Sequence, residues 1–391
     1  MTPRIVTGIG IASALGTGAS GAFFAALENA KRLGPTQAST ITSFDATMHD
    51  SPPIVEVPEF DPTKYLGDKG LRTLDRLTKL LVVAARLCLH DAGFKKDGQW
   101  VALAPERVGV CCSNAYGSLE AITELDRVAK LEDARYINPA KFPNTVSNSA
   151  SGYVSIWEDL RALNVSVSDG NCGGLDAMAC ADIFLATGRA EAIITGGGEA
   201  MSEALFLAFL KLGVLGDTKL GDTKLGEGAT FLSLETPEAA KARGAKQLGA
   251  VVGYGTAFVA PAESSLLYAS RAAVERAITQ ALDDAKVSAG DIDLVVSGIS
   301  GLPQFDRQEL AAIDAVLGGS VTVAAPKLAL GETLGVGATM NMASALAWFS
   351  GVPIAKDLVV RGAATKPPKT VVVTTIGYYG NASAVVMRAT A

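Results

Sequence analysis

The segment Val165-Ser-Val-Ser-Asp-Gly-Asn-Cys-Gly-Gly174 predicts a strand that ends at a sharp turn, directly before a helix. That helix, expected over Gly174–Thr187, is rich in alanine and glycine, and we expect it to be buried because small side chains let backbones approach closely. A side chain at the turn faces the positive end of the helix dipole. Cys172 is therefore expected to have a lowered pKa and to be a good nucleophile. The alternative for Cys172 is a small, buried, apolar thiol.

The pattern of helix and strand occurs twice along the chain. Thr73 to Asp91 has apolar residues at three- to four-residue steps, which predicts an amphipathic helix, and the strand Val108–Cys112 follows it. Ser270 to Asp284 has the same pattern and precedes the strand Leu294–Val296. A second repeat combines a small-residue helix, an apolar strand and a glycine turn: Gly174–Thr187, Ala192–Thr195 and Gly196–Gly198, then Gly335–Trp348, Val371–Thr375 and Gly377–Gly380.

These repeats predict an α/β protein built from two similar halves, which we place at residues 1–246 and 247–391. Strands that are apolar throughout and alternate with helices indicate a sheet with helices on both faces. The boundary is not a linker, because Gln247 to Phe258 itself has the pattern of a strand.

Composition excludes several classes of protein. Hydrophobic residues make up 49% of the 391 residues and charged residues 19%, so the chain can bury a large core and is not expected to be disordered. Lysine and arginine number 34 against 40 acidic residues, and this net charge of −6 argues against nucleic-acid binding. The sequence has no uninterrupted run of about 18 apolar residues, so a membrane span is not expected. Five cysteines without secretory features favour a reducing cytoplasm.

No cofactor and no metal are expected. Gly8-x-Gly10-x-x-Ser13 resembles part of a dinucleotide-binding fingerprint, but it lacks the third glycine and the later acidic residue. A turn is the better interpretation of these glycines. The chain has only two histidines, His49 and His90, and no Cys-x-x-Cys pair, which argues against a metal site and a serine–histidine triad. We interpret both histidines as surface residues.

Several motifs follow the order and spacing of one enzyme family. They are Arg4–Gly10, Phe142-Pro143 with Asn148 and Gly152, Gly188–Glu199, Gly226-Glu-Gly-Ala229, Leu234-Glu235 and Ala239–Lys246. On these motifs the chain resembles, nearly end to end, the type II β-ketoacyl-acyl-carrier-protein synthases, or ketosynthases, of the thiolase superfamily. The resemblance implies a thiolase-like five-layer αβαβα sandwich of two duplicated halves.

The positions that match the family's catalytic residues hold different side chains. The family uses a cysteine nucleophile and two histidines, supported by a lysine, to take up an acyl chain and to decarboxylate a malonyl thioester. The nucleophile position is Asn171, and placing the neighbouring Cys172 there would require a deletion in the buried helix. The histidine positions fall at Ile299 and Glu332, whereas the lysine is retained as Lys327.

Two features of this former site follow from the resemblance. Lys327 and Glu332 are expected to form an ion pair, and a general-base role for Glu332 is the alternative, although a carboxylate repels a malonyl carboxylate. The family's gating loop Gly-Phe-Gly-Gly is here Gly377-Tyr-Tyr-Gly380, so Tyr378 and Tyr379 are the predicted substrate-binding residues. A buried tyrosine hydroxyl needs a hydrogen-bond partner, so this change is expected to narrow the acyl entrance.

The resemblance is greatest to chain-length factors, which keep the ketosynthase fold and pair with an active ketosynthase in type II polyketide systems. It implies an active ketosynthase and an acyl carrier protein as partners, with the strand Asn164–Ser168 pairing across the dimer axis. The candidate residues for docking the acidic carrier are Lys64, Lys69, Arg72 and Arg76. Two alternatives stay open: an acyltransferase or thioester hydrolase that uses Cys172, and a homodimeric pseudoenzyme that binds acyl chains or carrier proteins.

Overall fold

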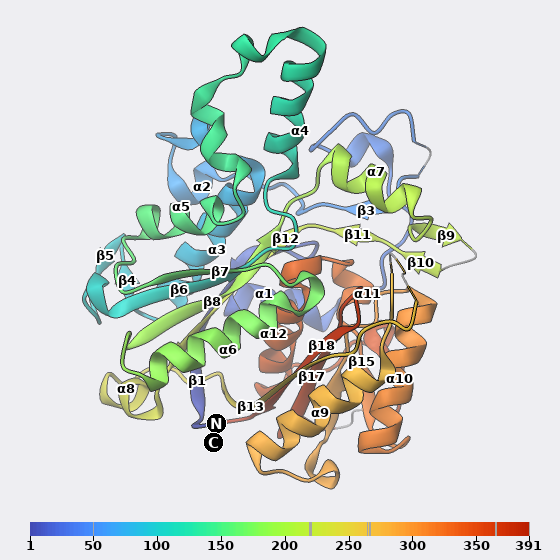
Figure 1. Cartoon of the computed structure of the whole chain (residues 1–391). Helices are drawn as coiled ribbons and strands as arrows, with labels where there is room; N and C mark the ends of the chain where they lie inside the picture. Colours follow the sequence, from blue (N-terminus) through green and yellow to red (C-terminus); the bar gives the residue numbers. More distant parts are fainter. Residues whose placement is uncertain (50, 219–220, 264, 266, 364–365, 391) are drawn as a thin grey trace.

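A computed structural model describes residues 1–390 apart from 50, 219–220, 264, 266 and 364–365. In this part of the chain, twelve strands form one continuous sheet (Figure 1). They are β1 (Arg4–Ser13), β2 (Gly16–Ala19), β6 (Val108–Ser113), β7 (Asn164–Val167), β8 (Ala192–Glu199), β12 (Gly228–Glu235), β13 (Gly249–Phe258), β14 (Leu294–Val296), β15 (Thr322–Ala324), β16 (Val359–Arg361), β17 (Thr370–Ile376) and β18 (Asn381–Arg388).

The remaining elements are short strand pairs and helices. The pairs are β3 (Ile54–Val55) with β11 (Leu225–Gly226), β4 (Lys95–Lys96) with β5 (Gln99–Trp100), and β9 (Gly216–Thr218) with β10 (Gly221–Thr223). The α-helices are α1 (Ser20–Glu28), α2 (Thr63–Leu66), α3 (Arg76–Asp91), α4 (Leu119–Val128), α5 (Ser149–Glu158), α6 (Gly173–Ala186), α7 (Glu203–Lys211), α8 (Pro237–Ala242), α9 (Arg271–Ala285), α10 (Pro303–Leu317), α11 (Lys327–Leu330) and α12 (Gly337–Phe349). None of the helices described has both the length and the apolar character needed to cross a membrane.

The order of the strands confirms the duplication. One half of the sheet runs β7-β6-β8-β12-β1 and the other runs β15-β14-β17-β18-β13. If the five strands of each half are numbered in the order of the chain, their order across the sheet is third, second, fourth, fifth, first in both halves. The directions also agree, because β6 is parallel to β7 and β8 as β14 is parallel to β15 and β17. Strands β1 and β13 join the halves through an antiparallel ladder that includes Arg4 opposite Val251. The division at residues 246 and 247 stays a prediction.

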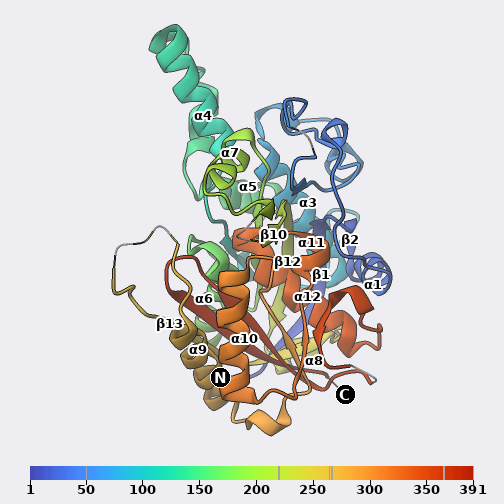
Figure 2. The same cartoon turned by 90° about the vertical axis from the view of Figure 1, so that its right-hand side faces the viewer.

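Helices cover the two halves in layers, as the family resemblance implies (Figures 1 and 2). Helix α3 packs on β1, β12 and β8, and α9 packs on β13 and β18 on the far side of the molecule. Between the halves, α6 lies on β6 and β8, α12 lies on β17, and the two helices contact each other. Every residue of α12 from Gly337 to Trp348 is buried. The five-layer αβαβα sandwich is thus confirmed.

Helix boundaries differ from the predicted ones by a few residues, for a local reason. Helix α3 begins at Arg76, because the Asp75 side chain caps it by accepting a hydrogen bond from the Thr78 N–H at 2.7 Å. Helix α9 begins after Ser270, whose hydroxyl accepts from the Ala273 N–H at 3.1 Å.

Two glycine-rich stretches that we expected to be turns lie inside strands. Gly8 belongs to β1, and Gly197 belongs to β8, which continues to Glu199. A Cβ on Gly8 would lie 2.4 Å from the Ala92 backbone N, and one on Gly197 would lie 2.3 Å from the Ser113 O. The expectation of turns is therefore wrong: these glycines let neighbouring elements pack at backbone distance.

Candidate functional site

The Gly170–Cys172 turn has the predicted form. Strand β7 ends at Val167, residues 170–172 make one 3-10 turn, and α6 begins at Gly173. Gly170 has a φ of +51°, a backbone conformation that is costly for other residues. The turn therefore presents Asn171 and Cys172 at the N-terminal end of α6, beside the start of α12.

Asn171 is buried and held by the end of β17. Its side-chain N–H donates to the Ile376 O at 3.4 Å, and its backbone O accepts from the Thr375 hydroxyl at 3.1 Å. Its side-chain Oδ1 has no hydrogen-bond partner among the described residues. An amide is not one of the side chains that form covalent acyl intermediates. This position therefore cannot hold an acyl chain as a thioester.

Cys172 does not have the lowered pKa that its place at the turn predicted. Its side chain is fully buried, and burial raises the pKa of the thiol well above its usual range. The negative charges of Asp176 and Asp169 raise this pKa further. The expectation of a lowered pKa is therefore wrong, and a role of Cys172 as a nucleophile stays a prediction, since the thiolate is the nucleophilic form. Burial and the two acids outweigh the helix dipole.

Lys327 and Glu332 form the predicted ion pair. The Lys327 Nζ lies 2.8 Å from the Glu332 Oε1, and each side chain is only 1% exposed. The same carboxylate oxygen accepts a hydrogen bond from the Leu334 N–H at 3.0 Å. Helix α11 carries the lysine, and the loop after that helix carries the glutamate. Each buried charge is thus compensated by the other.

Tyr378 fills the space between the Gly170–Cys172 turn and this ion pair. It is buried, and its ring packs edge-on against Phe305 with 4.9 Å between the ring centres. Its hydroxyl makes no hydrogen bond of ordinary geometry in the described part of the chain, although it faces Asn171 and Glu332. Burial raises the pKa of Tyr378 well above its usual range, and the Glu332 charge adds to this shift. The hydroxyl therefore stays protonated.

Tyr379 points away from this interior. Its side chain is 52% exposed, and its hydroxyl lies 3.5 Å from that of Tyr116, which follows β6 in the other half. Burial, together with Tyr379, raises the pKa of Tyr116. The substrate-binding role of Tyr378 and Tyr379 stays a prediction.

Ile299 lies in the segment after β14 and is buried. Its aliphatic side chain cannot move a proton. The adjacent Gly298 N–H donates to Glu309 at 2.8 Å, and the Thr374 hydroxyl donates to the same carboxylate oxygen at 2.6 Å. Burial raises the pKa of Glu309. Sequence reasoning missed Glu309, because a lone acid in an amphipathic helix, here α10, gives no signal of burial.

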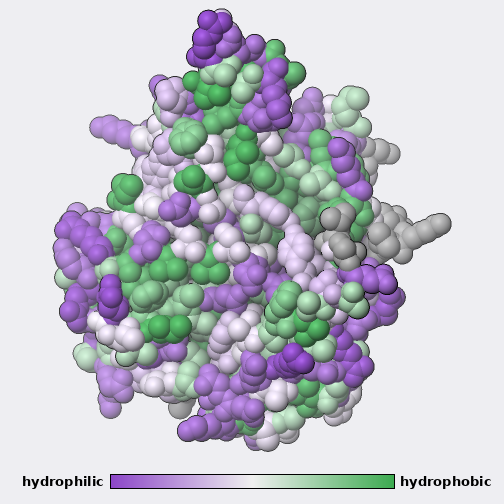
Figure 3. All heavy atoms as spheres, viewed as in Figure 1, coloured by the Kyte–Doolittle hydropathy of each residue, from purple (hydrophilic) through white to green (hydrophobic). Residues whose placement is uncertain are grey.

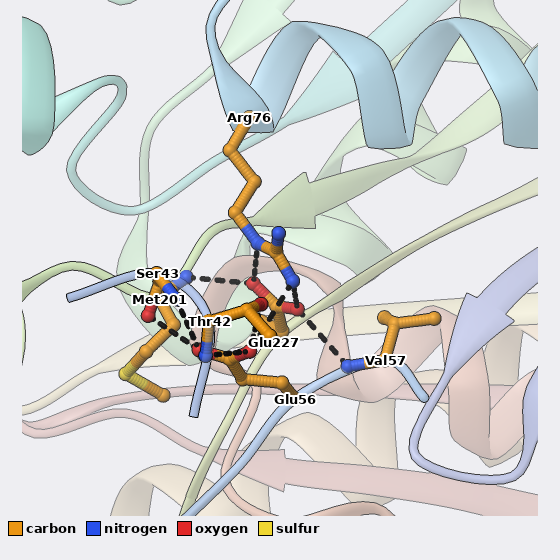
Figure 4. Close-up of polar contacts among 7 residues, drawn as sticks. All are labelled: Thr42, Ser43, Glu56, Val57, Arg76, Met201 and Glu227. Atoms are coloured by element: carbon orange, nitrogen blue, oxygen red, sulfur yellow. Dashed lines mark hydrogen bonds and ion pairs between the residues drawn. The ribbon is translucent and has the colours of Figure 1, made fainter. Parts of the chain in front are cut away.

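One of the four predicted carrier-docking residues is not available. Arg76 donates to the Glu227 carboxylate through Nε at 2.7 Å and Nη2 at 2.5 Å, and it lies 3.6 Å from Glu56 (Figure 4). Glu227 is fully buried and also accepts from the backbone N–H groups of Val57 and Met201. Arg76 is therefore a structural residue, and its predicted docking role is wrong. Lys64, Lys69 and Arg72 are exposed.

Comparison with known proteins identifies the family. The sequence model described as "Beta-ketoacyl synthase, N-terminal domain" matches residues 5–232, and "Beta-ketoacyl synthase, C-terminal domain" matches residues 248–352. The chain belongs to the β-ketoacyl synthase family.

Relatives at about 30% identity cover most of the chain. The tetracenomycin polyketide synthase ketoacyl synthase alpha subunit of Streptomyces glaucescens is 30% identical over 374 residues, which are 89% of this chain and 85% of that protein. The beta subunit of the same system is 29% identical over 362 residues, 88% of this chain and 85% of that protein. The 3-oxoacyl-[acyl-carrier-protein] synthase 2 of Vibrio harveyi is 28% identical, over 86% of this chain and 83% of that protein.

Solved structures confirm the thiolase fold. The ishigamide ketosynthase/chain length factor superposes with a TM-score of 0.87 at 23% identity, covering 100% of both chains. A β-ketoacyl synthase from Burkholderia phymatum superposes with a TM-score of 0.85 at 22% identity, again over 100% of both chains.

Proposed function

We propose that this chain is a non-condensing, ketosynthase-like subunit, a chain-length factor, that pairs with an active ketosynthase and shapes the tunnel for the growing acyl chain. The observation that carries the proposal is the content of the former active site. The sequence resemblance assigns Asn171 to the nucleophile position and Glu332 to a histidine position, and in the structure Asn171 is buried and Glu332 is paired with Lys327. Asn171 cannot take up an acyl chain as a thioester, and the charged Lys327–Glu332 pair does not offer the neutral donor that a histidine would.

The two histidines of the chain support this proposal, because neither can replace the missing ones. His90 is exposed at the end of α3. His49 packs edge-on against Phe206 in α7, with 4.8 Å between the ring centres. Both precede the Gly170–Cys172 turn in the sequence, whereas the family's histidines follow it.

The edge of the sheet supports a paired assembly. Strand β7 is the last strand of the sheet and has no neighbour beyond it among the described residues. Hydrophobic side chains gather in Figure 3 where Figure 1 draws β6, β7 and β8, with more along α4. Ile156 in α5 is 74% exposed and Ile183 in α6 is 58% exposed, and both helices pack beside β7. An open edge flanked by apolar residues favours pairing with another chain.

The tetracenomycin relatives support a role in a polyketide system, but their sequence identities do not distinguish an alpha subunit from a beta subunit. The chain is 30% identical to the alpha subunit and 29% identical to the beta subunit. The side chains at Asn171 and Glu332 support the non-condensing subunit, since they lack the groups that the family's condensing chemistry uses. An acidic acyl carrier protein is the second partner that we propose, and the exposed Lys64, Lys69 and Arg72 are its candidate docking residues.

Native mass spectrometry after affinity purification from the native source tests the proposal. A one-to-one complex with a ketosynthase that has Cys-His-His is expected, whereas a homodimer alone would contradict the heterodimer. Ile156→Asp should dissociate the complex, because it places a charge on the proposed interface. Val360→Asp is the control: Val360 is also exposed, at 36%, but it lies in β16 at the opposite end of the sheet, so the complex should persist. Labelling of Cys172 by an acyl thioester, lost in Cys172→Ala, would favour the acyltransferase or hydrolase.

A further inference from the structure

A cavity of about 330 Å³ lies at the base of α4, apart from the site around Asn171. Its walls include the start of α3 with the 3-10 turn before it, the first turns of α4, and residues from the segment 138–144. Its apolar lining residues are Leu74, Ala121 and Ala140, and the others are polar or charged. A cavity of this size can hold a small molecule, and this lining favours a polar one.

Several charged groups in these walls already have partners. The Arg76 side chain is turned toward the buried Glu227 (Figure 4). Lys141 forms an ion pair with Glu124, and the Asp75 side chain caps α3. A ligand in the cavity would therefore be held mainly by other groups.

Two cations on one wall have no such partner. Arg72 lies in the 3-10 turn (Leu71–Thr73) before α3, and Lys79 lies in α3. Neither side chain forms an ion pair or a hydrogen bond within the described ranges, and both line the cavity. A guanidinium and an ammonium group that line one cavity favour the binding of a carboxylate.

Two acceptors on the other wall are also without partners. The Glu120 carboxylate, in the first turn of α4, forms no ion pair or hydrogen bond with any described residue. Asn144 is only 6% exposed, and its side-chain N–H donates to the Thr73 O at 3.1 Å, but its Oδ1 has no partner in the described part of the chain. A buried acceptor without a donor is uncommon in folded proteins, so Asn144 indicates that a ligand supplies the donor.

The surroundings of Glu120 favour a donor that carries a positive charge. Burial raises the pKa of its carboxyl group, and the negative charges of Asp75 and Glu124 raise it further. The positive charges of Arg76 and Lys79 oppose this shift without cancelling it. A cationic group beside Glu120 would relieve the repulsion among the three acids. The same acids disfavour a ligand with several negative charges, such as a nucleotide.

We propose that this cavity binds a small zwitterion of about the length of a dipeptide. Its carboxylate contacts Arg72 and Lys79. Its ammonium group contacts Glu120 and Asn144, because three N–H donors suit a carboxylate and an amide oxygen. The cations and the acceptors belong to different elements, so a ligand with separated charges fits them better than a free amino acid, in which one carbon joins the two groups. This inference does not depend on the proposed function.

Binding of glycylglycine to the full chain, measured by saturation-transfer NMR, tests the proposal. Saturable binding is expected, with a Kd of about 1 mM or below. N-acetylglycylglycine lacks the ammonium charge and glycylglycinamide lacks the carboxylate. Each should bind about tenfold more weakly, because each loses the hydrogen bonds of one charged group. The absence of saturable glycylglycine binding, or equal binding of all three compounds, would overturn the proposal.

Two variants test whether the ligand binds in this cavity. Glu120→Gln should weaken glycylglycine binding and remove its advantage over N-acetylglycylglycine, while the advantage over glycylglycinamide remains. Lys79→Met should have the reverse effect. A general loss of structure would instead weaken all three compounds alike. Lys241→Met is the matched control: this exposed lysine lies in α8 and does not line the cavity, so all three affinities should stay the same. If Glu120→Gln and Lys79→Met keep the wild-type preferences, the assignment of the ligand to this cavity is wrong.

Discussion

The buried Lys327–Glu332 ion pair permits a quantitative test through Lys327→Met. Methionine keeps the length and apolar stem of lysine but removes its charge. Glu332, whose side chain is 1% exposed, would then keep the hydrogen bond from the Leu334 N–H but would have lost its counter-ion. Removing one member of a buried pair costs about 3–5 kcal/mol, because the remaining charge has lost both water and its counter-ion. We expect the free energy of unfolding to fall by about that amount.

A surface pair of the same chemistry provides the control. The Lys141 Nζ lies 2.5 Å from Glu124, but these side chains are 45% and 49% exposed, so Lys141→Met should cost no more than about 1 kcal/mol. The double variant Lys327→Met, Glu332→Gln should recover most of the loss, since no unpaired charge remains.

Reversible urea unfolding, followed by the fluorescence of tryptophans that include the buried Trp348, measures all of these variants. Coincident fluorescence and circular-dichroism transitions are needed before the free energies are compared. The reasoning is refuted if Lys327→Met loses less than about 1 kcal/mol and cannot be distinguished from Lys141→Met. A double variant that is less stable than Lys327→Met would refute it too, because the isolated Glu332 charge would then not be the cause.

Four further substitutions, one of them a control, test other parts of the molecule. Gly197→Ala should sharply lower the melting temperature, because its Cβ would lie 2.3 Å from the Ser113 O. Gly21→Ala in α1 is the control: its Cβ would meet no neighbouring atom within 4 Å, so the free energy of unfolding should rise by about 0.5–1 kcal/mol. Tyr378→Phe should raise the urea midpoint, since an unpartnered buried hydroxyl costs about 1–3 kcal/mol; a lower midpoint would show that this hydroxyl is bonded. Asn171→Cys should release no condensation product from acyl and malonyl thioesters in a radiolabel assay, because both histidines are still missing, and product formation would contradict this.

The parts of the fold that could be predicted are those with a local signal. The amphipathic stripe of α3 and the small residues of α6 and α12 indicate, within a few positions, helices that the structure contains. The repetition of these patterns indicates the two halves, and the strand order confirms them. The Lys327–Glu332 pair was also predictable, since the family resemblance places both residues in one small site.

The features that could not be predicted depend on contacts between distant segments. Gly8 was expected to form a turn because a sequence shows a glycine but not the helix backbone that passes beside it. The pKa of Cys172 depends on how deeply the turn is buried and on Asp176, which a dipole argument does not include. The Arg76 guanidinium forms an ion pair with Glu227, which lies 151 positions away in the sequence. Each error arose because tertiary packing decided a property that local sequence leaves open.

The charged side chains near Asn171 explain why Asn171→Cys alone is not expected to give condensation. A condensing site must offer uncharged donors to a malonyl carboxylate and to the enolate that forms from it. Here Glu332 brings a carboxylate, and Lys327, the cation that could attract a malonyl carboxylate, is already paired with Glu332 at 2.8 Å. Placing a malonyl group beside them would add a second negative charge to an interior that holds a single cation there. This charge balance supports the proposed non-condensing role.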